Sequence, residues 1–321
     1  MGEDTSKKSD KAPLVSACAG ILGSTAGKAV THPIDTIKAR IQVIPGATIQ
    51  VGKGSLIMNS IKEVIKNEGV AGLYKGLPTA LIGGIPAAFL YFGAYEFWKK
   101  NTLEVEYLKN HSFIAYLSGG MFAETVACIL FVPTDVLKER LQVQSKLRTY
   151  KYSSDLNALA QIFKNEGFRG LYKAYPATVF SFGPFSAFYF MFYEQLKGMV
   201  VKNDADTYLQ KVKESTHVKI GFFQSMFCSM IAGAGASLIT NPLDLVKLRL
   251  QVQRGSSSSG KNVSEFVYKH MLDGLIQVVK KEGLLALWNG SFARMCTHFP
   301  TVAISMSIIE VSKPHIEKIL V

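Results

Sequence analysis

The chain has 321 residues, of which 48% are hydrophobic and only 19% are charged, and its mean hydropathy is positive (+0.17). These values fit a membrane protein with many polar interruptions better than a soluble enzyme. The net charge of +12 suits contact with anionic lipid or nucleic acid, but the basic residues are spread over segment ends without a basic arm or run, which argues against nucleic acid.

The chain begins with a polar tail over residues 1–11, which carries both signs of charge. It lacks the apolar core of a secretory signal, and its acids argue against a cleaved transit peptide, so we expect any membrane address to be internal. Six later segments reach the ~20 residues that a membrane-spanning helix needs. They lie near residues 13–43, 73–100, 112–144, 171–200, 217–253 and 287–318.

Three phrases occur three times along the chain. The first has Pro, an acid, Lys, Arg and Gln at fixed offsets and starts at Pro33, Pro133 and Pro242. The second is an acid followed by Gly, at Glu68, Glu166 and Glu282, and the third is Glu-x-x-Lys, at Glu96, Glu194 and Glu310. Such repetition indicates three tandem modules, which we place at residues 12–107, 108–208 and 209–321.

An amphipathic stretch follows the first long segment of each module, at residues 61–66, 158–164 and 275–280. Its apolar face with a basic edge predicts a helix that lies at the membrane surface. The four cysteines, Cys18, Cys128, Cys228 and Cys296, lie within apolar segments without metal-ligand spacing and are interpreted as buried thiols.

The first phrase places an acid and a lysine on one face of each helix. One interpretation is three local, solvated pairs worth ~0.3–0.5 kcal/mol each. The threefold repetition offers another, a ring in which each Asp reaches the Lys of another repeat and closes one end of a central pore. The pairs of this ring are Asp35 with Lys138, Asp135 with Lys247 and Asp244 with Lys38.

The third phrase predicts a second ring at the other end of the pore. Its members are Glu96, Glu194, Glu310, Lys99, Lys197 and Lys313. Two rings on opposite sides of one cavity predict alternating access, in which one ring forms while the other separates. Ion pairs that exchange protein partners for water have small net energies, as such a switch requires.

These phrases resemble those of the mitochondrial carrier family over nearly the whole chain. The resemblance implies an all-α membrane protein of six tilted transmembrane helices in three repeats, each with a short matrix surface helix, in the inner mitochondrial membrane. It also implies both termini toward the intermembrane space and cardiolipin as a structural lipid at the acid-Gly segments. We expect a monomeric transporter that needs no cofactor and is not an enzyme.

The resemblance also assigns roles to the two rings. The first, with Gln42, Gln142 and Gln251 as braces, is the matrix network, and the second, with Tyr95 and Tyr193 as braces, is the cytoplasmic network. The chain departs from the family pattern at Ile309, where an aromatic brace is expected, which predicts a weaker cytoplasmic gate. Asn289 also replaces the basic residue that Lys75 and Lys173 supply in the other repeats.

Helix geometry locates further residues on the cavity side. Positions eleven and seven residues before each ring Asp face the same way as that Asp, and these positions include Glu124 and Lys28. Charges of this kind in mid-membrane are functional hypotheses by default; the alternative is that the two neutralise each other. By the resemblance, substrate also meets residues just before Pro86, Pro184 and Pro300. Those are Gly83, Gly84, Ser181, Phe182, Thr297 and His298, with Arg294 one turn earlier.

We therefore expect Arg294 and Lys28 to hold a carboxylate and Glu124 to hold an amine or another cation, with the glycines leaving room for a sizeable group. The stretches 83–88 and 124–136 are similar to the subgroup of S-adenosylmethionine carriers and mitoferrins. An iron or magnesium carrier, with Met295 and His298 as soft ligands, is an alternative, as is a proton-leak or channel protein of this fold. Exchange, uniport and proton coupling all stay open.

Overall fold

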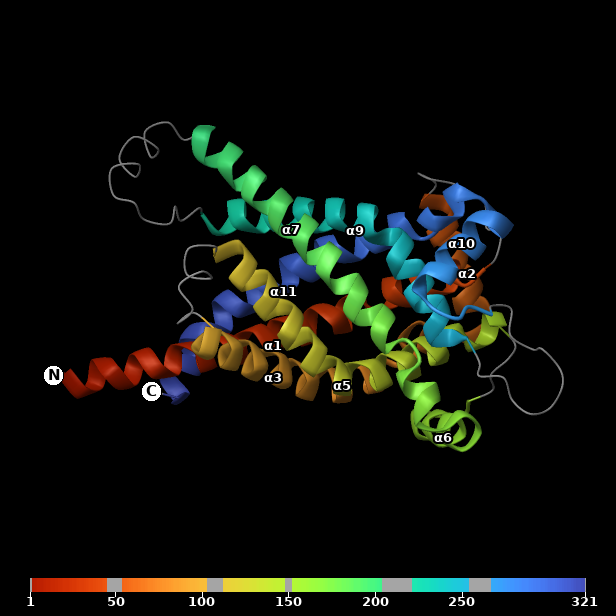
Figure 1. The fold of residues 1–321 in the computed structure, drawn as a ribbon, viewed down its shortest axis with the longest axis horizontal. Helices are drawn as coiled ribbons and strands as arrows, with labels where there is room; N and C mark the ends of the chain where they lie inside the picture. The colour runs from red at the N-terminus through yellow and green to blue at the C-terminus, as the bar shows by residue number, and fades with distance from the viewer. Residues whose placement is uncertain are drawn as a thin grey trace.

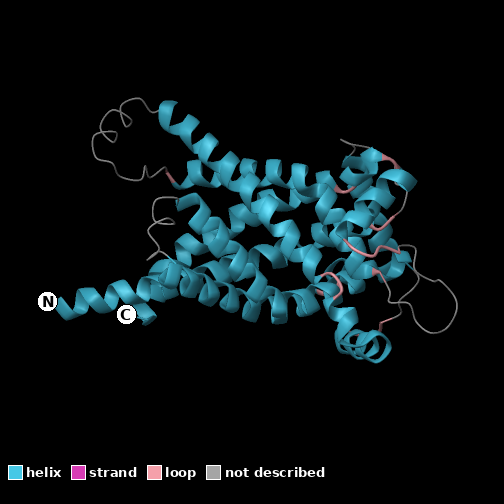
Figure 2. Cartoon of the chain, in the orientation of Figure 1, coloured by secondary structure: helices cyan, strands magenta, loops and turns pink. Residues whose placement is uncertain are grey.

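The computed structural model describes residues 2–44, 54–102, 112–147, 152–203, 221–253 and 267–320. Within these ranges the chain is a helical bundle without strands (Figures 1 and 2). Its long helices are α1 (Gly2–Gln42), α3 (Leu77–Thr102), α5 (Ser112–Leu147), α7 (Tyr175–Asn203), α9 (Phe222–Val252) and α11 (Ser291–Leu320). The shorter ones are α2 (Gly54–Glu68), α6 (Asp155–Tyr172) and α10 (Met271–Glu282), with 3-10 turns η1 (Val70–Tyr74) and η3 (Leu284–Trp288).

The six predicted long segments each correspond to one of the long helices. Residues 2–11, which we expected to form a separate polar tail, continue α1 as helix. By length and composition, three stretches of the described chain are apolar enough to cross a membrane, namely Val70–Asn101, Ser118–Lys146 and Phe222–Val252. The other three long helices complete the same bundle.

The long helices pack as a closed ring in which each repeat contacts the next. The second helix of one repeat packs against the first helix of the following repeat: α3 on α5, α7 on α9, and α11 back on α1. Both chain ends lie at one end of the bundle, and α2, α6 and α10 lie at the other (Figure 1). This arrangement agrees with the predicted topology of an even number of crossings.

Small residues allow α1 and α11 to approach closely. A Cβ atom added at Gly23 would lie 2.6 Å from the backbone oxygen of Ser305, and one added at Gly27 would lie 2.7 Å from the Ser305 hydroxyl. The Gly-x-x-x-Gly spacing therefore brings the first and last long helices together, as in other membrane helix pairs.

The acid-Gly phrase ends each surface helix. Gly69, Gly167 and Gly283 have φ of 73°, 63° and 91°, values that residues with a Cβ rarely adopt. Gly167 lies within the bounds of α6 and bends it there. The predicted amphipathic stretches fall in α2, α6 and α10, which bury apolar side chains such as Val64, Ile162 and Val278.

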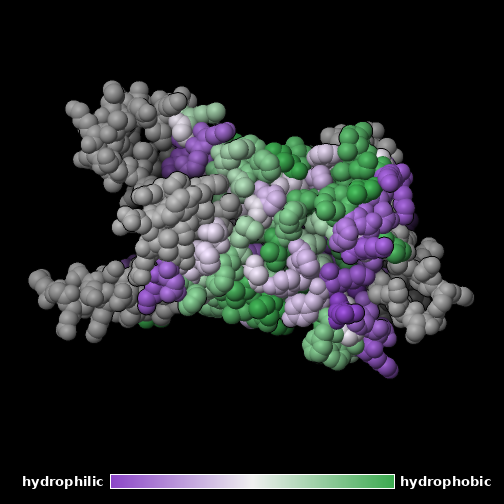
Figure 3. Space-filling model, viewed as in Figure 1, coloured by the Kyte–Doolittle hydropathy of each residue, from purple (hydrophilic) through white to green (hydrophobic). Residues whose placement is uncertain are grey.

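Apolar residues are distributed in a way that fits a membrane. Hydrophobic residues form a band across the middle of the molecule, and hydrophilic ones gather at the end that carries α10 and α2 (Figure 3). Large apolar side chains such as Ile82 (75%) and Phe223 (70%) are exposed on the outside of the bundle. Exposed apolar surface on this scale marks contact with lipid or a partner.

Candidate functional site

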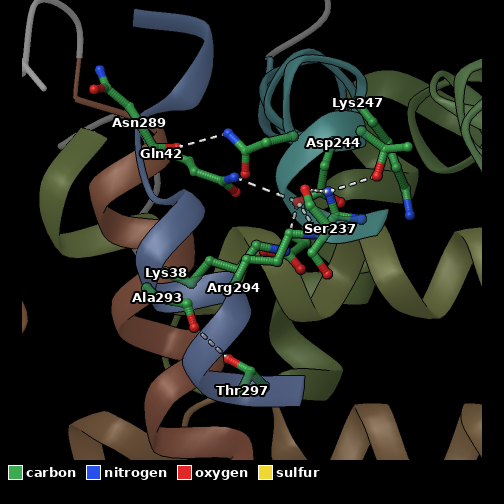
Figure 4. Close-up of polar contacts among 12 residues, drawn as sticks. Lys38, Gln42, Ser237, Asp244, Lys247, Asn289, Ala293, Arg294 and Thr297 are labelled. Carbon is green, nitrogen blue, oxygen red and sulfur yellow. Dashed lines mark hydrogen bonds and ion pairs between the residues drawn. The ribbon is translucent and has the colours of Figure 1, made fainter. Parts of the chain in front are cut away.

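The first part of the matrix network joins α1 to α9. Lys38 Nζ lies 2.6 Å from the Asp244 carboxylate, and Gln42 Nε2 donates to the same oxygen at 3.4 Å. Figure 4 shows that Arg294 of α11 also approaches Asp244, with its Nε at 3.6 Å. The predicted pair between repeats 1 and 3 is thus formed and braced, and it has one cation more than expected.

The second part joins α9 to α5. Lys247 Nζ lies 3.2 Å from the Asp135 carboxylate, and Gln251 Nε2 donates to Asp135 at 2.6 Å. The Asp135 and Lys247 side chains are only 10% and 16% exposed, so little water competes for this pair. Again a lysine of one repeat is joined to an aspartate of another.

The third predicted pair is absent, which corrects the expectation of a closed ring. Lys138 Nζ binds Glu139 of its own helix at 3.1 Å instead of Asp35. The brace is diverted as well, because Gln142 Nε2 donates to the Thr36 hydroxyl at 3.0 Å. The local carboxylate competes with Asp35 for the lysine, and repeats 1 and 3 have no such competitor, since Ala39 and Leu248 occupy the equivalent positions.

The cytoplasmic network is open in this structure. Among its described residues the only ion pair joins Lys197 to Glu194 of the same helix, at 3.7 Å. Of its braces, Tyr193 shares a hydrogen bond with Ser225 (3.1 Å) and Tyr95 stacks on Tyr91, with ring centroids 6.4 Å apart. The remaining members are all exposed: Glu96, Lys99, Glu310 and Lys313. Among the described residues, ion pairs therefore join different repeats in the matrix network but not in the cytoplasmic network.

A cavity of about 80 Å³ lies against the matrix network, between α1, α3 and α5. Its charged and polar lining consists of Lys28, His32, Asp35, Thr134, Asp135 and Lys138. Lys28 is exposed within the bundle, with its Nζ 5.7 Å from the centre of the Phe131 ring. A cavity lined by a lysine in mid-membrane is a place where a charged solute can be held.

Glu124, on α5, forms no direct ion pair with Lys28, and both residues belong to the described part of the chain. Its carboxylate accepts a hydrogen bond from the Cys128 thiol at 3.6 Å, and no ion pair within 4 Å joins it to any residue of the described chain. The two charges therefore do not form a direct ion pair with each other in this structure, and each is open to a ligand.

The two glycines of α3 differ. A Cβ atom added at Gly83 would lie 2.0 Å from the Thr134 side chain, so this glycine allows α3 and α5 to pack and does not leave room for substrate, contrary to our expectation. At Gly84 the nearest atom is the Lys28 ammonium, 3.9 Å away. Gly84 alone therefore opens space beside a cavity charge.

Arg294 is less available than predicted. Besides Asp244, it donates to the Ser237 backbone oxygen (3.1 Å) and the Thr240 hydroxyl (3.2 Å), so it belongs to the matrix network in this conformation (Figure 4). Its guanidinium also lies 5.5 Å from the Phe185 ring, on which His298 stacks at 5.7 Å.

The other predicted contact residues do not meet at one point. The Ser181 and Thr297 hydroxyls donate to backbone oxygens of their own helices, to Thr178 (2.9 Å) and Ala293 (2.9 Å). Phe182 is half-buried, near the position that a side chain at Gly120 would take. Ser181 and Phe182 lie on α7 and Thr297 on α11, and the two hydroxyls are satisfied within their own helices.

The threefold pattern has a match among known families. The family model described as "Mitochondrial carrier protein" matches the chain three times, at residues 9–105, 109–204 and 218–319. The chain is a mitochondrial carrier. Members of this family are transporters of the inner mitochondrial membrane and not enzymes, and we assign this carrier the same class and location.

Several curated proteins are similar to this carrier over most of their length. "Mitochondrial substrate carrier family protein E" of Dictyostelium discoideum is 33% identical over 92% of this chain and 93% of its own. "Probable S-adenosylmethionine carrier 2, chloroplastic" of Arabidopsis thaliana is 34% identical over 86% and 67%. "Mitochondrial RNA-splicing protein MRS4" of Saccharomyces cerevisiae is 29% identical over 95% and 91%.

Sequence reasoning did not identify a second set of charges beneath the matrix network of this carrier. In each repeat the arginine of the first phrase binds the glutamate of the acid-Gly phrase, and its Nε donates to the backbone oxygen of a glutamine in another repeat. The bound pairs are Arg40–Glu68, Arg140–Glu166 and Arg249–Glu282. The oxygens reached are those of Gln142 (2.9 Å), Gln251 (3.1 Å) and Gln42 (2.9 Å). The fixed offsets of Arg and Glu were the only signal for this interlock.

Glu68 shows the electrostatic consequence of these contacts. Burial by itself raises the pKa of the Glu68 carboxyl, but hydrogen bonds from Arg40 and Lys75 outweigh it and lower the pKa to about 2. The carboxylate is therefore held in its charged form, which keeps α2 attached to α1.

Proposed function

We propose that this carrier transports an amino-acid-like zwitterion or cation, with S-adenosylmethionine as the first candidate. The observation that carries this proposal is the pair of uncancelled mid-membrane charges, Lys28 and Glu124. A base and an acid that do not bind each other suit a solute with a carboxylate and a cationic group. S-adenosylmethionine has a carboxylate, an amine and a sulfonium.

The proposed mechanism is alternating access. The matrix network is joined across repeats by Lys38–Asp244 and Lys247–Asp135, whereas the cytoplasmic network has no such ion pair among its described members. This state suits entry of solute from the cytoplasmic side. Forming the cytoplasmic pairs while the matrix pairs separate then releases solute to the other side, at a small net energy for each exchange.

The relatives support a substrate of this class. Besides the Arabidopsis protein, "Mitochondrial S-adenosylmethionine carrier protein" of Mus musculus is 29% identical over 86% of this chain. A metal cation is the competing substrate. Within the described residues, no three His, Cys, Asp or Glu side chains come together as a metal group.

The test is uptake by liposomes that contain purified protein. Labelled S-adenosylmethionine is supplied outside, with S-adenosylhomocysteine as the unlabelled competitor. We expect saturable, competed uptake, and we expect Glu124→Gln to lower it at least about tenfold, since a charge-assisted contact is worth ~1.5–3 kcal/mol. Transport of ferrous or magnesium ions without uptake of S-adenosylmethionine would assign this carrier to the metal alternative.

We also propose cardiolipin as a structural lipid of the monomer. A surface cavity of about 320 Å³ lies at the start of α10 and is lined by Lys173, Lys269 and His270 beside apolar residues. Cations and a helix N-terminus favour phosphate, and the apolar lining favours acyl chains. Addition of cardiolipin to delipidated protein should raise its melting temperature, and Lys173→Gln should reduce that increase.

A further inference from the structure

The cavity that lies against the matrix network contains an acid that the symmetric arrangement would have neutralised. Asp35 lines this cavity, and in the described part of the chain no residue forms a hydrogen bond or an ion pair with it. Its symmetry equivalents Asp135 and Asp244 are both paired with lysines. Asp35 is thus the one ring aspartate that is available to a ligand.

Glu139 is the reason that Asp35 is available. It lies one residue after Lys138, is 8% exposed, and takes the Lys138 ammonium through Oε1 at 3.1 Å. Its Oε2 is buried without a hydrogen-bond partner. A buried carboxylate is costly unless a cation stays beside it, so Glu139 retains Lys138.

The cavity is also lined by a base, Lys28, that forms no ion pair or hydrogen bond with the described residues. Lys28 lies two helical turns before Asp35 on α1, about 10 Å along the axis, and it lines the same space. No ion pair or hydrogen bond joins Lys28 to Asp35, both of which lie in the described part of α1. The other two charges of the lining, Asp135 and Lys138, are both occupied.

An unpaired ammonium and an unpaired carboxylate therefore face one small cavity. The cavity has a volume of about 80 Å³ and is partly open, so a charged group of a larger solute can enter it. Gly84 leaves the space beside the Lys28 ammonium open, with nothing nearer than 3.9 Å to an added Cβ atom.

We infer that this cavity binds the α-amino-acid group of the substrate, with its carboxylate on Lys28 and its ammonium on Asp35, and that Glu139 is the specificity-determining residue that keeps Asp35 free for it. The substrate ammonium then takes the place that the Lys138 ammonium would hold in a symmetric ring. This inference rests on the proposed function and adds where the amino-acid group lies; Glu124 remains for the second cationic group.

The test measures binding by the thermal stabilisation of purified full-length carrier, so that it does not depend on transport. The probes are S-adenosylmethionine, its decarboxylated analogue and its deaminated analogue. To reach the same rise in melting temperature, wild-type carrier should need an at least about tenfold higher concentration of either analogue than of S-adenosylmethionine, because each analogue lacks one charge-assisted contact. Lys28→Gln should bind S-adenosylmethionine and the decarboxylated analogue equally well, while it still discriminates against the deaminated analogue. Asp35→Asn should bind S-adenosylmethionine and the deaminated analogue equally well, while it still discriminates against the decarboxylated one.

Glu139→Gln is the decisive variant. It releases Lys138 to Asp35, so the two probes with an amine should bind about tenfold more weakly while the deaminated analogue binds as before. Glu139→Ala, which places the side chain of the equivalent Ala39 there, provides a second variant. Glu63→Gln is the matched control. The Glu63 carboxylate, which is exposed, pairs at 2.5 Å with Lys146, a lysine near the end of the helix that carries Glu139, and neither residue lines the cavity.

The outcomes separate the two proposals. Uptake of S-adenosylmethionine without discrimination between the probes overturns the inference and leaves the proposed function intact. Unchanged discrimination in both Glu139 variants overturns the role of Glu139. If wild-type carrier neither takes up nor is stabilised by S-adenosylmethionine, the proposed function fails and the inference fails with it.

Discussion

The asymmetry of the matrix network makes a quantitative prediction for three equivalent substitutions. Asp244→Asn removes the charge that Lys38 contacts at 2.6 Å and that Arg294 approaches at 3.6 Å. The Lys38 and Asp244 side chains are 18% and 19% exposed, so the pair is intermediate between a buried and a surface ion pair. Loss of one partner costs ~3–5 kcal/mol for a fully buried pair and ~0–1 kcal/mol for a surface pair. We therefore expect a loss of about 2–3 kcal/mol.

The same change at Asp35 should cost much less. Asp35 has no ion pair or hydrogen bond with the described residues, so Asp35→Asn should stay within about 1 kcal/mol of wild type. Asp135→Asn should resemble Asp244→Asn, because Lys247 and Gln251 both bind that carboxylate.

The assay is thermal unfolding of each purified variant in one detergent. At roughly 2 °C per kcal/mol for a chain of this size, Asp244→Asn and Asp135→Asn should melt about 4–6 °C below wild type, and Asp35→Asn no more than about 2 °C below it. Three equal decreases would refute the reasoning, because they would mean that Lys138 pairs with Asp35 and that Glu139 does not retain it.

Three further predictions concern other parts of the molecule. Gly83→Ala should destabilise the carrier by about 1–3 kcal/mol, because the added Cβ atom would lie 2.0 Å from the Thr134 side chain. Gly84→Ala should be neutral or up to ~1 kcal/mol stabilising. Melting curves of the two variants test this, and equal effects would contradict the packing role of Gly83. The pKa of the Glu68 carboxyl is lowered to about 2, so its contribution to folding stability is fully present above the ordinary pKa of 4.5 and is lost as the pH falls from 4.5 toward 2. In Glu68→Gln the melting temperature should therefore depend less on pH over that interval. An unchanged pH dependence in this variant would contradict the role of Glu68. Lys197→Ala should change stability by less than ~0.5 kcal/mol, because its pair with the neighbouring turn is exposed, yet it should reduce uptake by liposomes; a large loss of stability would indicate a closed cytoplasmic network.

Much of the fold could be predicted from local patterns. The six long helices, the surface helices and their end at Gly69, Gly167 and Gly283 follow from periodicity and from the need for φ > 0 at those glycines. The pairs Lys38–Asp244 and Lys247–Asp135 follow from threefold repetition, since equivalent residues of tandem repeats converge on one axis.

The site was harder to predict, because symmetry holds only where the repeats carry the same residues. Glu139 has no counterpart in the other repeats, and it changes the partner of Lys138. Similarly, Arg294 was predicted for the cavity but reaches Asp244, since the distance between α11 and α9 decides which acid is near it. Gly83 was interpreted as room for substrate, whereas the position of Thr134 on another helix makes it a packing residue.

The sequence by itself determined that this protein is built of three repeats and that its long helices are apolar with charges at matching positions, from which two rings of ion pairs were predicted. Periodicity and repetition are properties of neighbouring residues, so they can be seen without coordinates. Only the tertiary structure decided which charges are paired and that the matrix network, but not the cytoplasmic one, has ion pairs between repeats. It also decided that Asp35 and Lys28 form no ion pair with any described residue. The physical reason is that an ion pair depends on a few ångströms between helices far apart in the chain, and a single nearby carboxylate is enough to change it.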